Sequence, residues 1–128
     1  MKYPVWVLRE VVFKLHEQSL AQFGGSAGVR DEGLADSALG KPQNLFAYGK
    51  PDIFELAASY ALGLVKNHPF IDGNKRTGFV VSVVFLELNG YEFRASEVDA
   101  AVRTLALAAG EMSESAYAEW LKANSKRA

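Results

Sequence analysis

Hydrophobic residues recur along most of this chain three or four positions apart, which is the spacing of an amphipathic helix. The pattern predicts a first helix from Trp6 to Phe23. Its apolar stripe consists of Val7, Val11, Leu15 and Leu20. The pair Gly24-Gly25 is a typical helix end, so we expect the helix to stop there. A polar cap at Asp31 predicts a short second helix that ends near Leu39.

The segment from Gly40 to Pro51 interrupts this helical pattern. It contains helix breakers, among them Pro42, Gly49 and Pro51, so we predict a loop or a short extended flap. The next helix is expected to begin at Asp52 and to run to about Lys66, because Asp52 and Glu55 have capping-box spacing. Its small residues favour close packing with a neighbouring helix; they are Ala57, Ala58, Ala61 and Gly63.

The segment from Gly73 to Leu88 is apolar almost all round, which predicts a buried central helix. β-Branched residues between Val80 and Phe85 leave a strand as an alternative. The length of the segment favours a helix, and Asn89-Gly90 is a good helix stop. Close packing explains a glycine at position 78, and room for a ligand is the other explanation.

Two further helices are predicted towards the C-terminus. Ser96 is a typical N-cap for a helix that reaches Ala109, and Ser113 begins a last one. The final residues, Asn124 to Ala128, are expected to fray. The sequence therefore predicts a compact all-α bundle of about six helices, with residues 1–128 forming a single domain.

Composition narrows the function classes. With 128 residues, 49% of them hydrophobic, and a net charge of −1, the chain has neither the composition of a disordered protein nor the basic surface of a nucleic-acid-binding one. The absence of cysteine excludes disulfides, thiolate metal sites and cysteine nucleophiles. The longest apolar run, Phe79 to Leu86, is too short to span a bilayer, and charges interrupt the N-terminal segment before a signal-like stretch is complete. We expect a soluble cytoplasmic protein that contacts neither nucleic acid nor membrane.

Residues 68–78, which read His-Pro-Phe-Ile-Asp-Gly-Asn-Lys-Arg-Thr-Gly, are the most informative stretch. We interpret Asp72 as the N-cap of the helix that follows, with Gly73 to Arg76 as its first turn. Lys75 and Arg76 then lie at the positive end of the helix dipole, where each cation costs about 0.3–1 kcal/mol. A bound phosphate would offset that cost, and the free N–H groups of a helix start suit it.

The other residues of this stretch fit such a site. Gly73 allows the backbone to approach a ligand closely, and Asn74 can donate from its amide. His68 can move a proton near neutral pH. An ordinary loop-to-helix turn with a solvated Lys-Arg pair is the alternative for any single residue, whereas the whole set favours a nucleotide-phosphate site with a general base.

This stretch resembles the Fic superfamily motif, His-Pro-Phe-x-(Asp/Glu)-Gly-Asn-Gly-Arg-x-x-Arg. Lys75 stands where most Fic proteins have glycine, and Phe79 stands where they have the second arginine. Both departures match the death-on-curing branch, the Doc-type toxins, whose motif looks like His-x-Phe-x-Asp-(Ala/Gly)-Asn-Lys-Arg-Thr. Weaker similarities lie outside the motif, at Gly24-Gly25, Gly28, Arg30-Asp31, Ser37 to Leu39, Pro42-Gln43 and Phe46 to Gly49.

The resemblance implies a small helical bundle, sometimes with a short β-hairpin flap, and a set of roles. His68 would be the general base, and Asp72 would hold Mg²⁺ near the phosphates of ATP. Gly73 and Asn74 would line an anion hole, and Lys75 and Arg76 would bind phosphate groups. Phe70 is expected to anchor the loop in the core.

The resemblance also implies an activity and partners. Doc-type proteins transfer the terminal phosphoryl group of ATP to a threonine of elongation factor Tu, and each pairs with a Phd-like antitoxin whose disordered tail folds against it. Transfer of AMP, as in ordinary Fic enzymes, and a non-enzymatic nucleotide- or antitoxin-binding domain are the alternatives.

Two features were interpreted from the residues alone. The segment Lys41 to Pro51 is a candidate target-docking flap that would align a peptide by strand addition, with Phe46 and Tyr48 as contacts. Packing of these two aromatic side chains onto the core is the alternative. His16 is interpreted as a packing or capping residue rather than a catalytic one.

Overall fold

The computed structural model describes residues 3–128, and these form six helices and two short strands. In chain order the elements are α1 (Arg9–Phe23), α2 (Glu32–Tyr48), α3 (Ile53–Asn67), α4 (Asn74–Leu88), β1 (Tyr91–Phe93), α5 (Glu97–Ala109), α6 (Glu114–Ala123) and β2 (Ser125–Arg127). This confirms an all-α architecture of six helices. No helix in this part of the chain is long and apolar enough to cross a membrane.

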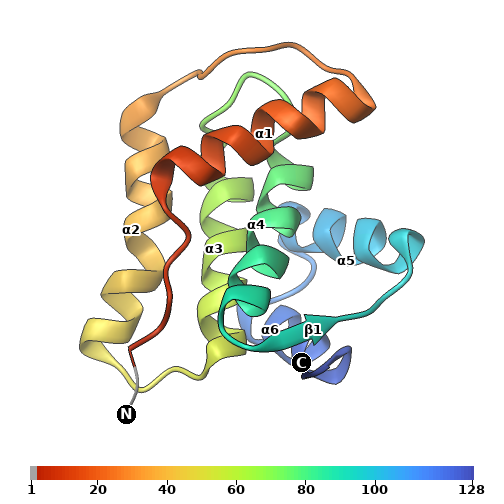
Figure 1. The fold of residues 1–128 in the computed structure, drawn as a ribbon. Helices are drawn as coiled ribbons and strands as arrows, with labels where there is room; N and C mark the ends of the chain where they lie inside the picture. The colour runs from red at the N-terminus through yellow and green to blue at the C-terminus, as the bar shows by residue number, and fades with distance from the viewer. Residues whose placement is uncertain (1–2) are drawn as a thin grey trace.

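Helix α3 lies at the centre of the bundle, where α2, α4 and α6 pack around it (Figure 1). Helix α1 crosses near the N-terminal end of α4 and beside the loop that joins α3 to α4. We had predicted that the Gly73–Leu88 segment would be the central helix, and this was wrong. Almost every residue from Phe54 to Val65 is buried, whereas Leu88 of α4 is 46% exposed. The small side chains of α3 explain its position, because neighbouring helices can approach it from several sides.

Two glycines show how closely the helices approach one another. A Cβ atom on Gly63 would lie 3.0 Å from the carbonyl oxygen of Ala38 in α2. A Cβ atom on Gly78 would lie 3.0 Å from Cγ1 of Val65 in α3. The predicted close packing at these positions is therefore confirmed, and the space at Gly78 is filled by α3 rather than open to a ligand.

Helix α2 contradicts the predicted flap, because it continues without a break to Tyr48 with Pro42 inside it. A proline inside a helix costs about 3 kcal/mol, since it removes one hydrogen bond and crowds the preceding turn. Packing outweighs this cost: Ala38, Leu39 and Pro42 are all buried in the interface with α3. The backbone N–H and carbonyl groups of this segment form hydrogen bonds within the helix as far as Tyr48. The segment therefore cannot align a peptide by strand addition, and the flap prediction is wrong.

Strand β2 contradicts the predicted fraying of the C-terminus. Ser125–Arg127 pairs antiparallel with Tyr91–Phe93, with Glu92 opposite Lys126. The backbone N–H of Ala128 donates to the carbonyl of Gly90 at 3.0 Å, which extends the pairing by one position. Each strand has only three residues, too few for alternation in the sequence to reveal it.

Four of the helices begin with the side-chain caps that the sequence predicted. Asp31, Ser96 and Ser113 each accept a hydrogen bond from a backbone N–H in the first turn of their helix. Asp52 and Glu55 form a reciprocal capping box at the start of α3. Each of these helices also carries an acidic residue in its first turn. The start of α4 is built differently, and the candidate site lies there.

Candidate functional site

His68 ends α3 in a left-handed conformation, with φ 53° and ψ 53°. It is the only non-glycine residue with positive φ in the described chain (residues 3–128). Such a conformation persists only when surrounding contacts hold it, and it is concentrated at functional sites. Arg30 supplies two of these contacts: its Nε donates to the carbonyl of His68 at 2.8 Å, and its Nη2 to that of Asn67 at 2.9 Å. The imidazole of His68 is left exposed.

The start of α4 lacks a side-chain cap. The N-cap is Gly73, at φ 79°, and the helix begins at Asn74, so the prediction of Asp72 as N-cap was wrong. The first backbone N–H of the helix with an acceptor among residues 3–128 is that of Thr77, which donates to the carbonyl of Gly73 at 3.0 Å. The N–H groups of the three residues at positions 74–76 have no such acceptor, and the first turn holds no acidic residue. This helix start is therefore free to bind an anion.

The carboxylate of Asp72 lies immediately before this helix start and is held by two backbone N–H groups. Gly73 donates to its Oδ1 at 2.8 Å, and Ser26 donates to its Oδ2 at 3.2 Å. The hydrogen bond from Ser26 contributes most to lowering the pKa of Asp72, and the one from Gly73 contributes next. The nearby His68 and His16 lower this pKa further. The side chain is thus an exposed, ionised carboxylate close to the imidazole of His68.

The side chain of Asn74 is buried and committed to the loop. Its Oδ1 accepts from the backbone N–H of Phe70 at 3.0 Å, and its Nδ2 donates to the carbonyl of Phe70 at 2.9 Å. We had expected this amide to donate to a ligand, and the structure contradicts that expectation. Only the backbone N–H of Asn74 remains for a ligand, so the side chain fixes the shape of the loop.

Lys75 and Arg76 are both exposed on the first turn of α4. Neither forms an ion pair with any residue in the described part of the chain. The guanidinium carbon of Arg76 lies 3.9 Å from the ring centroid of Phe23, at the end of α1. This cation–π contact orients the guanidinium without neutralising its charge.

The segment from Gly24 to Arg30 contacts the motif loop, a role beyond the helix end and turn that its glycines predict. Val29 forms a single antiparallel bridge with Phe70, and the backbone N–H of Ile71 donates to the carbonyl of Gly28 at 3.1 Å. The three glycines at positions 24, 25 and 28 all have positive φ. This clustering of glycines was the available signal, because it marks a loop whose backbone approaches another segment closely.

The rings of Phe70 and His16 pack on the buried side of the motif loop. Phe70 is fully buried, as expected for an anchor, and the ring of His16 stacks on it with centroids 3.7 Å apart and an interplanar angle of 9°. Nε2 of His16 lies 2.8 Å from the carbonyl oxygen of Asp72. The predicted packing of His16 is therefore confirmed, and the ring also makes a polar contact with the loop backbone.

The two residues proposed for a docking flap lie on α2, away from this loop. Phe46 packs edge-on against Tyr3 and Trp6, with ring centroids 5.7 and 5.9 Å apart. Tyr48 is 92% exposed at the end of the helix. Packing therefore explains Phe46, whereas a docking role for Tyr48 stays a prediction.

Comparison with known proteins identifies the same family as the motif residues of this loop do. Residues 6–86 match the Fic/DOC family, and this match includes all of the motif and more than half of the chain. The chain belongs to the Fic/DOC family. It is 35% identical over 115 residues to "Protein kinase doc" of Escherichia phage P1, an alignment that covers 88% of this chain and 90% of that protein. It is 41% identical over 83 residues to "Toxin Doc" of Mycolicibacterium smegmatis (strain ATCC 700084 / mc(2)155), which covers 62% of this chain and 63% of that one. The resemblance to the Doc branch is thus confirmed.

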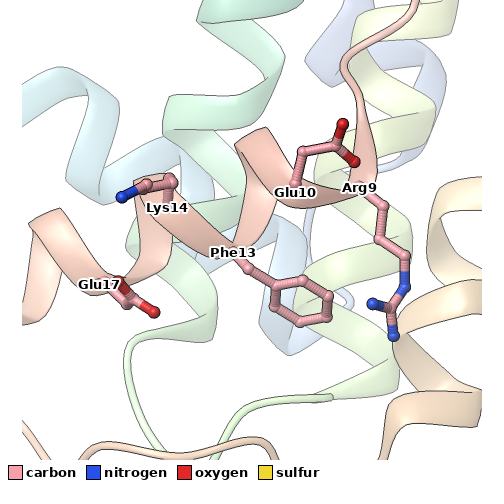
Figure 2. Close-up of a pocket in the computed structure, with 5 residues that line it drawn as sticks. All are labelled: Arg9, Glu10, Phe13, Lys14 and Glu17. Carbon is pink, nitrogen blue, oxygen red and sulfur yellow. The ribbon is translucent and has the colours of Figure 1, made fainter.

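Two surface hollows involve helix α1. One hollow of about 330 Å³ lies along the exposed face of α1 and is lined by Arg9, Glu10, Phe13, Lys14 and Glu17 (Figure 2). A second, of about 320 Å³, lies between α1 and the segment from Ala27 to Val29. Neither is lined by His68, Lys75 or Arg76. These two hollows therefore do not include the start of α4.

The Fic/DOC site offers a single carboxylate to a metal ion. No group of three or more histidine, aspartate or glutamate side chains is placed to hold a metal among residues 3–128. Asp72 nevertheless fits a shared Mg²⁺ site, because it is exposed, its pKa is lowered, and the ion commonly takes one or two carboxylates together with substrate phosphates and water.

Proposed function

We propose that this protein is the toxin of a toxin–antitoxin pair, and that it transfers the terminal phosphoryl group of ATP to a threonine or serine hydroxyl of another protein. The observation that carries the proposal is the start of α4. Within residues 3–128, three backbone N–H groups of its first turn have no acceptor and two exposed cations on that turn form no ion pair, and the exposed His68 precedes them in the same loop. The name of the phage P1 relative, a protein kinase, supports the same reaction.

In this proposal His68 is the general base. Its imidazole takes the proton of the target hydroxyl while the oxygen attacks the γ-phosphorus of ATP. The bond from that phosphorus to the bridging oxygen breaks, ADP leaves, and a phosphoester remains on the target. The left-handed backbone of His68, held by Arg30, fixes the direction from which the base acts. General-base catalysis typically contributes about 10²–10⁴ in rate.

The start of α4 would hold the phosphates. The backbone N–H groups of positions 74–76, with Gly73 allowing close approach, form the anion site. Lys75 supplies a point charge, and Arg76 can donate to two oxygens while it stacks on Phe23. Asp72 would hold Mg²⁺, which neutralises charge on the phosphates when bound.

The identity of two residues favours phosphoryl transfer over transfer of AMP. Lys75 adds a charge where most Fic proteins have glycine, so the outermost phosphate can be held more firmly. Phe79 stands where they have the second arginine, and its ring packs against those of Phe93 and Trp120, with centroids 5.8 and 6.3 Å away. No cation stands at position 79 to hold the inner phosphates.

ATP labelled separately at the α and the γ phosphate distinguishes the two reactions. We expect label only from the γ position on the target protein, and a mass gain of one phosphate. Label from the α position and a gain of one AMP would reject phosphoryl transfer in favour of AMP transfer. Replacement of His68 by alanine should lower the rate about 10²–10⁴-fold without loss of ATP binding, whereas Lys122→Ala, on the exposed face of α6, should leave it unchanged. Full activity of the His68 variant would reject both enzymatic functions.

We also propose the two protein partners that the Doc resemblance implies. The target would be a translation factor of the elongation factor Tu type, and a Phd-like antitoxin with a disordered tail would fold against this protein. Mass spectrometry of elongation factor Tu after incubation with this protein and Mg-ATP tests the first. Suppression of the modification by a co-expressed antitoxin tests the second.

A further inference from the structure

His16 is a buried titratable residue that the proposed mechanism does not use. Only 4% of it is exposed, and it lies on α1, more than fifty residues before the motif. Its ring nevertheless lies against three residues of the motif loop. It stacks on Phe70, its Nε2 lies 2.8 Å from the carbonyl oxygen of Asp72, and a Cβ atom added to Gly73 would lie 3.6 Å from its Cδ2. A side chain that only filled space would not need the polar contact.

The polar contact falls on one peptide unit, the one between Asp72 and Gly73. Its carbonyl oxygen lies against His16, and its N–H donates to Oδ1 of the Asp72 carboxylate at 2.8 Å. The two groups of a planar trans peptide point in opposite directions. The carbonyl is thus turned into the protein, and the N–H is turned towards the exposed carboxylate at the start of α4.

This peptide unit is able to turn over, because one of its two flanking residues is glycine. Gly73 has φ 79°, and glycine adopts positive and negative φ about equally readily. The unit could therefore rotate at little local cost if nothing held its carbonyl. In the rotated state the carbonyl oxygen, with its partial negative charge, would face the anion site, and the carboxylate of Asp72 would lose the hydrogen bond from Gly73.

We propose that His16 is a positioning residue: its Nε2–H donates to the carbonyl of Asp72 and keeps the Asp72–Gly73 peptide turned with its N–H on the Asp72 carboxylate and its carbonyl away from the start of α4. The role in phosphate binding rests on the proposed function, whereas the orientation of the peptide does not. His16 touches no reacting atom. It acts through the peptide and the carboxylate of Asp72, so its first effect is on nucleotide binding.

The tautomer of His16 is testable in the unmodified protein. The proposal requires hydrogen on Nε2, which long-range ¹H–¹⁵N NMR correlations of the imidazole distinguish from hydrogen on Nδ1. We expect the Nε2–H form. Observation of hydrogen on Nδ1 alone would overturn the proposal, because an unprotonated Nε2 cannot donate to a carbonyl.

Two substitutions separate the hydrogen bond from the packing of the ring. His16→Phe keeps a flat ring against Phe70 and removes the donor, whereas His16→Gln keeps a donor near the position of Nε2 and removes the ring. We expect His16→Phe to bind Mg-ATP about tenfold more weakly, as loss of one hydrogen bond worth about 1.4 kcal/mol predicts. His16→Gln should bind within about threefold of the original protein, even if it melts at a lower temperature.

Unchanged affinity for Mg-ATP in His16→Phe would overturn the proposal. Equal losses in both variants would also overturn it, because the ring and not the donor would then matter. If His16→Phe does not fold, His16→Gln and the tautomer decide. If the original protein binds no nucleotide, the proposed function fails. The amide NMR resonance of Gly73 then remains as the test, and it should shift in His16→Phe and stay in place in His16→Gln.

Discussion

Arg30 holds the carbonyl of His68, with Nε donating at 2.8 Å across a separation of 38 residues in the sequence. This contact connects the glycine-rich segment before α2 to the strained end of α3. The backbone N–H groups of Arg30 and Asp31 both donate to the carbonyl of Pro69, at 2.7 and 3.0 Å, so the same segment also fixes the next residue of the motif. The candidate base is therefore positioned from outside its own helix.

We expect Arg30→Lys to destabilise the protein by about 1 kcal/mol and to slow the proposed reaction more than it weakens ATP binding. A lysine ammonium is a single point donor and cannot replace the planar fork that contacts two carbonyls. Urea unfolding measures the first effect, and rates at saturating ATP measure the second. Arg103→Lys is the matched control, because Arg103 pairs with Asp99 on an exposed helix face, and it should change little. Equal effects in both variants would contradict a role for Arg30 in positioning His68.

Gly25→Ala should destabilise the protein by about 1–3 kcal/mol. Gly25 has φ 125°, and a Cβ there would lie 2.9 Å from Cδ2 of Leu20 and 3.0 Å from Oδ2 of Asp72. The methyl group would push the loop away from the carboxylate, so ATP binding should weaken as well. Thermal unfolding and titration with Mg-ATP measure the two effects.

Gly40→Ala is predicted to have the opposite sign and to stabilise the protein by about 0.5–1 kcal/mol. Gly40 lies inside α2, its φ is not in the left-handed region, and a Cβ there would meet nothing within 4 Å. The same thermal unfolding experiment measures it. A loss of stability would show that this part of the chain is not helical in solution.

Phe46 and Tyr48 should respond very differently to alanine. Phe46→Ala removes a half-buried ring that packs on Tyr3 and Trp6, so we expect a loss of about 2–3 kcal/mol. Tyr48→Ala should lie within about 0.5 kcal/mol of the original protein, because its side chain is almost fully exposed. Urea unfolding gives both values. If Tyr48 contacts the target, its variant should modify the target more slowly while remaining fully stable; an unchanged rate would exclude that role.

Stability should fall at alkaline pH because of two buried tyrosines. Burial raises the pKa of both Tyr60 and Tyr117 to about 12, from 10.0. Above pH 10 the unfolded chain releases these protons while the folded protein retains them, so the contribution is complete below pH 10 and is lost as the pH rises towards 12. A shift of two pKa units corresponds to about 3 kcal/mol for each tyrosine. Urea unfolding between roughly pH 8 and 12 measures the loss, because this range includes both the ordinary pKa of 10.0 and the raised pKa of about 12. Tyr60→Phe should reduce the dependence of stability on pH.

Features that are local in sequence were predicted well. The caps at Asp52, Ser96 and Ser113 were correct because each depends only on hydrogen bonds within one helical turn. The motif from His68 to Arg76 was recognised for a similar reason, since its residue types occur together in one short segment.

Errors occurred where contacts between distant segments decided the outcome. Pro42 predicts a break from sequence alone, yet packing on α3 keeps α2 helical through it. The amide of Asn74 appeared free to donate to a ligand, and instead it closes the loop on the backbone of Phe70. The C-terminal residues formed a strand because Tyr91–Phe93 lies beside them.

The sequence by itself determined the helical architecture, the position of the candidate site and the chemical groups present there, because periodicity, capping and residue type are local properties of the chain. Only the tertiary structure decided how those groups are held. His16 and Ser26 contact Asp72, and Arg30 contacts His68, across separations of 38 to 56 residues. Contacts of that range arise from the packing of α1 and the following loop against α4, which no local pattern encodes.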